Sequence, residues 1–233
     1  MKRYLLLALP ALAALAAACQ KEAPMPVCTN DCTTLSGRLV TAGGQAPIEG
    51  AAVVVKWHYG SASWPKARVK TRGKTDGNGR YSLSFRIDDP ELHEGYFTVG
   101  YEVDQQRYYS IGENQVAFRD LPRDTAITTR DYLIPRLAWA RLVFMNQPRL
   151  QADGGSFFTE FGSCYGFNTT FRRDILGGGS VLFWYGTGSP ERTLPIPADQ
   201  PLMLRISRNS AGRATADSVF VPAGTTRTFP LVY

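Results

Sequence analysis

Apolar and polar side chains alternate with a period of two along several stretches of this 233-residue chain. The pattern is clearest in residues 81–87, 97–103 and 202–206, where aromatic or aliphatic residues are separated by single, mostly polar ones. Successive side chains of a β-strand point to opposite faces, so each stretch predicts a strand with one face on a core and one in water. Residues 51–57 are almost continuously apolar, which is typical of a central strand covered on both faces.

Turn-forming residues separate the strand candidates. Clusters of Gly, Pro, Asn and Asp lie at residues 43–44, 76–79, 88–90 and 177–179. Further strand candidates are residues 137–144, 180–185 and 225–233. No segment past residue 18 keeps a helical apolar period for three turns, and we expect one short helical turn near residues 89–94. The sequence therefore predicts an all-β fold of the sandwich class.

The N-terminal segment is typical of an exported protein. Met1-Lys2-Arg3 precedes an apolar run, residues 5–17, and small residues then lead to Cys19. A membrane-spanning helix needs about 20 apolar residues, so this run is too short to be one. A charged start, a short apolar middle and small residues before a cut site indicate a signal peptide. An ordinary signal cut near Ala18, with Cys19 incidental, is the alternative.

This segment resembles the bacterial lipoprotein signal, in which a small residue precedes a Cys that becomes acylated. The resemblance implies a signal peptide at residues 1–18, lipidation of Cys19 and a lipidated tether at residues 19–33. Stable anchoring needs two or more acyl chains, which such a modification supplies. Because Gln20 rather than Asp follows the Cys, the family's sorting rule implies the outer membrane, on either its periplasmic or its cell-surface face.

Charge gives no indication of a nucleic-acid partner. Removing residues 1–18 takes away Lys2 and Arg3, so 26 basic side chains become 24 against 20 acidic ones, and the net charge falls from +6 to +4. No block of five like charges occurs, and a nucleic-acid patch is therefore not expected. A weak attraction to anionic lipid headgroups or polyanionic glycans is compatible with this charge.

Three cysteines remain once Cys19 is acylated: Cys28, Cys32 and Cys164. An odd number in an oxidising compartment implies one pair and one unpaired thiol. Turn formers between Cys28 and Cys32 favour a local disulfide, while pairing of Cys164 with either one, or three reduced thiols, are the alternatives. Three thiols and two distant histidines do not match the spacing of zinc ligands, so we expect no metal and no cofactor.

Three blocks of sequence carry a second resemblance: residues 36–40 (SGRLV), 46–55 (APIEGAAVVV) and 74–83 (KTDGNGRYSL). Gly50 allows a tight turn into a strand, and residues 76–79 supply the turn of a hairpin. Together the blocks resemble the carboxypeptidase regulatory-like domain, a transthyretin-like β-sandwich.

The resemblance implies such a sandwich at residues 34–135, with residues 58–70 as an unusually long insert. Domains of this family are generally non-catalytic modules for folding, docking or spacing. Residues 136–233 are then expected to form a second β-sandwich. The predicted fold is therefore two β-sandwich modules in tandem after a signal peptide and a short tether.

Residues 162–166 (GSCYG) have the spacing of a nucleophile elbow with Cys164 as the nucleophile. That chemistry needs a strand–turn–helix context and a base within reach. The residues that follow are β-prone, and the only two histidines, His58 and His93, belong to the other module. A Cys-dependent hydrolase is therefore the least favoured function, and no catalytic residue is assigned.

Aromatic side chains give the one indication of a ligand. Trp57, Tyr59 and Trp64 bracket a Gly/Ser-rich stretch, and Trp184 stands between two other aromatic residues that must point the opposite way. Exposed aromatic platforms bind sugars or partner proteins. Packing in a core is the default for each of these residues, and the ligand platform is the less favoured hypothesis.

These observations predict a non-catalytic binding or scaffolding protein of the cell envelope. Its expected partners are the membrane, through the lipid anchor, and an envelope protein or a glycan. A carbohydrate-binding accessory protein that uses exposed aromatic side chains is the first alternative.

Replacing Cys19 by Ser should move the protein into the soluble periplasmic fraction, because no acyl chain can then be attached. Cell fractionation with the unmodified chain as control measures this. If the Cys19→Ser variant still sediments with membranes after a carbonate wash, the anchor hypothesis is wrong.

Overall fold

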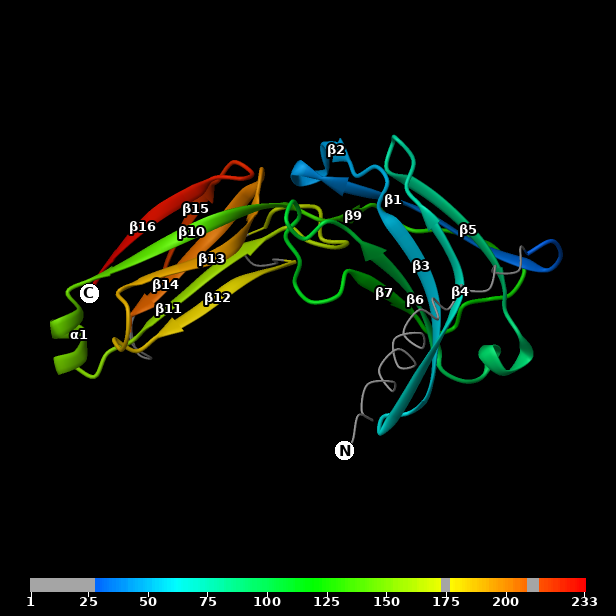
Figure 1. Cartoon of the computed structure of the whole chain (residues 1–233), viewed down its shortest axis with the longest axis horizontal. Helices are drawn as coiled ribbons and strands as arrows, with labels where there is room; N and C mark the ends of the chain where they lie inside the picture. The colour runs from blue at the N-terminus through cyan, green and yellow to red at the C-terminus, as the bar shows by residue number, and fades with distance from the viewer. Residues whose placement is uncertain (1–27, 173–176, 209–213) are drawn as a thin grey trace, which may run out of the picture.

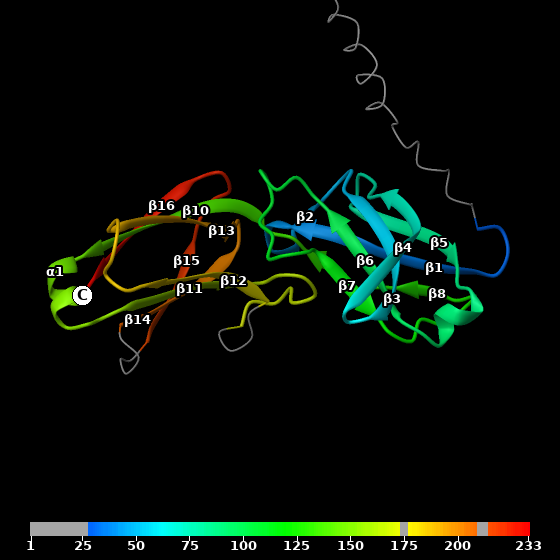
Figure 2. The ribbon, with the colours of Figure 1, turned by 60° about the horizontal axis from the view of Figure 1, so that its bottom comes forward.

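The protein is described by a computed structural model that covers residues 28–172, 177–208 and 214–233. Cys19 and the expected signal peptide lie outside the described residues. Within them, strands β1 to β16 accompany one short α-helix, α1 (Gln147–Ala152), and two 3-10 turns. The strands form two lobes that lie end to end (Figures 1 and 2). The predicted all-β fold of the sandwich class is confirmed.

The first sheet of the first lobe is built around β1 (Cys32–Thr41). β1 pairs antiparallel with β2 (Ala46–Pro47) and β5 (Arg80–Arg86), and parallel with β8 (Ala126–Thr128) and β9 (Tyr132–Leu133). β1 therefore has a partner strand on both of its edges, β5 and β8 along its first half and β2 and β9 near its end. η1, the 3-10 turn at Ala42–Gly44, connects β1 to β2.

The second sheet of this lobe has the order β4-β3-β6-β7, and its strands are β3 (Ala52–Ser61), β4 (Trp64–Lys74), β6 (Tyr96–Glu102) and β7 (Gln115–Phe118). The expected central strand is β3, which has Val53, Val54 and Val55 buried in succession. Apolar side chains of both sheets, such as Phe85 and Phe97, pack against each other and form the core of this lobe. The 3-10 turn η2 (Asp89–Leu92) lies where one short helical turn was expected.

The turn at residues 76–79 is present, but the hairpin expected around it is not. Gly79 donates its backbone N–H to the carbonyl oxygen of Asp76 at 2.9 Å. The strands on either side, β4 and β5, belong to different sheets, because β4 pairs with β3 while β5 pairs with β1 from Arg38 to Cys32. The turn therefore carries the chain from one layer of the sandwich to the other.

The second lobe has a three-stranded sheet, in which β10 (Arg136–Met145) is antiparallel to β13 (Glu191–Ala198) and parallel to β16 (Thr226–Val232). Its four-stranded sheet has the order β12-β11-β14-β15. These strands are β11 (Phe157–Ser163), β12 (Gly178–Trp184), β14 (Pro201–Arg208) and β15 (Thr215–Phe220). Fully buried side chains such as Leu142, Phe157 and Phe161 fill the space between the two sheets.

Two glycines of the cluster expected to form a turn belong to a strand instead. Gly178 and Gly179 are the first residues of β12, and Gly179 pairs with Gly162 on β11. A Cβ atom on Gly179 would collide with the carbonyl oxygen of Phe161. The close approach of the two strands, rather than a turn, explains why glycine stands here.

The two lobes are joined by more than the covalent chain. Only residues 134–135 separate β9, in the first lobe, from β10, in the second. Val40, Leu133 and Cys164 form a small buried cluster between the lobes. Leu133 and Gly166 also exchange two backbone hydrogen bonds of 2.8 Å each.

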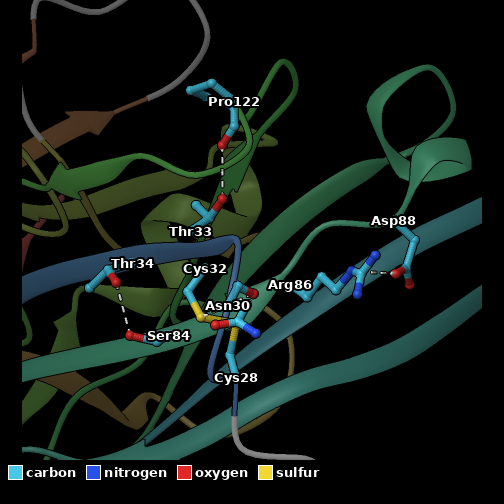
Figure 3. Close-up of a disulfide and its surroundings, with 9 residues drawn as sticks. All are labelled: Cys28, Asn30, Cys32, Thr33, Thr34, Ser84, Arg86, Asp88 and Pro122. Carbon is cyan, nitrogen blue, oxygen red and sulfur yellow. Dashed lines mark hydrogen bonds and ion pairs between the residues drawn. A yellow bond between two sulfur atoms is a disulfide. The ribbon is translucent and has the colours of Figure 1, made fainter.

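A disulfide joins Cys28 to Cys32 at the start of β1 (Figure 3). β1 begins two residues before residue 34, the expected start of the first module. Thr33 is fully buried, and its hydroxyl donates to the carbonyl oxygen of Pro122 at 3.0 Å. The disulfide therefore lies at the N-terminal end of the central strand of a packed sheet.

Replacing Gly79 by Val should destabilise the first lobe by about 2 kcal/mol or more. Gly79 has a φ of 73°, which a β-branched residue resists, and its Cβ would collide with the carbonyl oxygen of Leu39. Gly77→Val is the matched control, because a Cβ there meets only Glu49 at 3.9 Å. Thermal unfolding measures both variants, and an unchanged melting temperature for Gly79→Val would contradict the turn geometry.

Candidate functional site

Trp57 belongs to the core, so its expected role in a ligand platform is wrong. Its side chain is 8% exposed, and its indole N–H donates to the carbonyl oxygen of Glu94 at 3.0 Å. Tyr59, which is half-buried, stacks on it with ring centroids 4.2 Å apart. Both residues point to the inner side of β3, on the same face as Val53 and Val55.

Trp184 is also a core residue rather than a platform residue. It is 3% exposed, stacks on Phe144 at 4.2 Å and donates its indole N–H to the carbonyl oxygen of Thr187 at 3.1 Å. Of the three tryptophans considered for a ligand platform, only Trp64 lies at the surface, with 77% of its side chain exposed. The four predicted residues therefore do not form one platform.

The neighbours of Trp184 form an exposed apolar strip. Val181, Phe183 and Tyr185 are 50%, 58% and 66% exposed, and Phe183 contacts Phe158 on β11 with ring centroids 4.7 Å apart. We call Phe158, Val181, Phe183 and Tyr185 the β12 strip. Alternation in the sequence shows that Trp184 and its neighbours point in opposite directions, but the packing of the sheet decides which side faces water.

The β12 strip lies along an open sheet edge. β12 stands at the end of the order β12-β11-β14-β15, so one of its two edges carries no strand in the part of the chain described. An ion pair between Glu160 and Arg205, 2.9 Å long, lies on the same face as Phe158. The strip thus combines aromatic surface, a charged border and a free backbone edge.

A polar groove of about 700 Å³ lies over β1, β5 and β8. Its lining combines hydroxyl groups with charged side chains of both signs: Ser36, Ser82, Thr128, Arg38, Lys74, Arg80, Asp76 and Asp131. Arg38 lies 3.4 Å from Asp131, whereas Lys74 and Arg80 form no ion pair with any described residue. Such a groove can bind a polyhydroxyl or anionic group.

The strands β3 and β4 extend past the rest of their sheet as a hairpin. The last pair between β3 and β6 is His58 with Tyr96, but β3 and β4 continue to the pair Ser61 with Trp64. This end projects from the first lobe (Figure 1). We call residues 56–74 the hairpin arm. It holds six basic residues and no acidic one: Lys56, Lys66, Arg68, Lys70, Arg72 and Lys74.

Two of these basic residues are held by carboxylates at the base of the hairpin arm. Lys70 is the extra residue of a β-bulge, and its ammonium lies 2.8 Å from Glu91, a carboxylate that is almost fully buried. Arg68 pairs with Glu91 and, at 2.9 Å, with Asp88. Burial alone would raise the pKa of Asp88, but the adjacent cations outweigh it and lower that pKa.

The cysteine and histidine side chains are not assembled for nucleophilic catalysis in the described residues. Cys164 is buried in the cluster between the lobes, and burial raises the pKa of its thiol. His58 lies 2.8 Å from the hydroxyl of Thr98 and stacks on Tyr96; burial lowers its pKa. His93 follows η2 at the surface. No group of three His, Cys, Asp or Glu side chains in the described ranges could hold a metal ion.

Comparison with known proteins identifies no family. No protein-family profile and no curated protein matches the sequence. Among solved structures, the Bacillus anthracis TIE protein has a TM-score of 0.34 and 12% identity over 87% of this chain and 34% of its own. Shaft pilin SpaA of Lactobacillus rhamnosus GG has a TM-score of 0.32 and 10% identity over 88% of this chain and 98% of its own. A streptococcal ancillary pilin has a TM-score of 0.29 and 9% identity, over 88% and 63%.

This chain spans about a third of the length of the TIE protein. All three TM-scores lie below 0.5, so these similarities assign no function. None of the described helices is long and apolar enough to cross a membrane.

Replacing Trp184 by Ala should lower the free energy of unfolding by about 3–5 kcal/mol, because it removes a buried aromatic ring. Phe183→Ala, one residue away and exposed, is the matched control and should change it by less than about 1 kcal/mol. Denaturant unfolding measures both variants. Equal losses would contradict the inward placement of Trp184.

Proposed function

We propose that this protein is a lipid-anchored, non-catalytic binding protein of the cell envelope, and that it docks an envelope protein on the β12 strip. The observation that carries the proposal is the exposure of Val181 and Phe183 on the edge strand β12 and of Tyr185 directly after it. Contiguous apolar surface on a soluble domain marks an interaction site more often than scattered apolar residues do.

An edge strand offers a partner two kinds of contact. Its unpaired backbone N–H and C=O groups can hydrogen-bond to an added strand, while alternate side chains select which strand fits. On β12 those outward side chains are Val181 and Phe183, and Phe158 broadens the surface from β11. Aromatic residues of this kind contribute much of the binding energy at protein interfaces.

The proposed location rests on the N-terminal sequence. Cys19 with its preceding small residues supports acylation, and Gln20 supports sorting to the outer membrane. Between Cys19 and the disulfide at Cys28 only a short tether remains, which supports a protein held close to its membrane.

Photo-cross-linking in cells tests the docking proposal. A photoreactive residue at Val181 should capture one reproducible envelope protein, and the same residue at Val232, which is 49% exposed on β16, is the matched control. Adding Phe183→Ala and Tyr185→Ala should reduce capture at least about tenfold, because two aromatic contacts are lost. Equal capture from both positions, or capture that survives the double substitution, would overturn the proposal.

Carbohydrate binding is the second candidate, and the polar groove favours it. Hydroxyls of Ser36, Ser82 and Thr128 stand beside Lys74 and Arg80. Neither cation has an ion pair with a described residue, whereas the carboxylate of Asp76 accepts two backbone N–H groups. This combination suits an acidic sugar. Binding to an array of acidic glycans should then be lost on Arg80→Ala and retained in the Phe183→Ala, Tyr185→Ala protein. If no acidic glycan on the array binds the protein in a way that Arg80→Ala abolishes, this candidate is excluded.

A further inference from the structure

We propose that the tip of the hairpin arm docks on an anionic lipid surface, with Trp64 entering the headgroup region and Lys66 contacting lipid phosphates. This contact is a second point of attachment to a membrane, separate from the β12 strip and from any acyl chain at Cys19.

The shape of the hairpin arm brings Trp64 to a surface before the rest of the lobe. Ser61 pairs with Trp64, so residues 62–63 are the whole turn. Trp64 is 77% exposed, the largest exposure among the large apolar side chains described. Within the described residues, only β4 pairs with β3 beyond His58, so the hairpin arm can approach a flat surface without steric hindrance from its own sheet.

The composition of the tip fits the boundary between lipid and water. Tryptophan prefers this region because its ring is largely apolar while its N–H can hydrogen-bond. Lys66 lies two residues from Trp64 and therefore on the same face of β4. It faces Tyr59 across the hairpin, so aromatic and cationic groups alternate on one side of the tip.

The charge of the hairpin arm complements anionic headgroups. Its six basic residues occur without an acidic one. Arg68 and Lys70 are neutralised by Asp88 and Glu91, but Lys66, on the same face as Trp64, has no ion pair with any described residue. Each free cation near an anionic membrane strengthens binding about fivefold. A lipid surface fits better than a soluble polyanion, because a polyanion would give Trp64 no apolar region to enter.

Vesicle binding tests the proposal with a chain that starts at Gln20 and so has no acyl chain; it contains every described residue and both cores. We expect binding to vesicles of phosphatidylglycerol and phosphatidylcholine, and little binding to phosphatidylcholine alone. Trp64→Ala should raise the dissociation constant about tenfold, and Lys66→Gln about fivefold. Brominated lipids should quench the fluorescence of Trp64 on binding.

Two control variants separate this surface from the others. Trp139→Ala removes another partly exposed tryptophan, on β10 in the second lobe, and should leave vesicle binding unchanged. Phe183→Ala, on the β12 strip, should also leave it unchanged, so failure of the proposed function and failure of this inference are distinguishable.

Three results would overturn the inference. The first is equal binding to anionic and neutral vesicles. The second is a Trp64→Ala variant that binds like the unmodified chain, with its thermal unfolding unaltered. The third is binding to dextran sulfate that depends on Lys66 but not on Trp64, which would make the hairpin arm a site for soluble polyanions.

Discussion

Hydrogen bonding to β1 organises the first lobe and its connection to the second. The first half of β1 has β5 on one side and β8 on the other, and its last residues pair with β2 and β9 instead. Because a strand in the middle of a sheet must satisfy its backbone on both sides, each of these four partners is held in register by β1. Val40, near the end of β1, then packs on Leu133 and Cys164 between the lobes.

The two surfaces proposed to bind partners lie at the periphery of the joined lobes (Figures 1 and 2). The junction between the lobes is closed by further polar contacts, including the hydroxyl of Tyr109 with that of Ser180 at 2.8 Å and the backbone N–H of Ile111 with the hydroxyl of Tyr165 at 3.1 Å. The β12 strip and the hairpin arm lie in different lobes (Figures 1 and 2). A protein of this form could hold a partner on one lobe while the other contacts a membrane.

The hairpin arm also shows why counting consecutive like charges along the sequence misses cations that strand pairing brings together. The chain has no block of five consecutive like charges, because apolar and neutral residues separate the cations of residues 56–74. Pairing of β3 with β4 brings Lys56 and the cations of β4 onto one hairpin. The sequence shows a segment of 19 residues without an acidic side chain, but only the pairing shows how its cations divide between two faces. Lys66 and Arg68 lie on the face of Tyr59 and Trp57. Lys56, Arg72 and Lys74 lie on the opposite face.

The sequence by itself determined the strand content, since alternation and turn formers report local backbone geometry. It also predicted that the strand at residues 81–87 has one face on a core, which the burial of Tyr81, Leu83, Phe85 and Ile87 bears out. Only the tertiary structure decided that the turn at residues 76–79 links two sheets, and that Trp57 and Trp184 point inward while Trp64 and Phe183 do not. The physical reason is that period-two patterning separates two faces of a strand without saying which one a second sheet will cover.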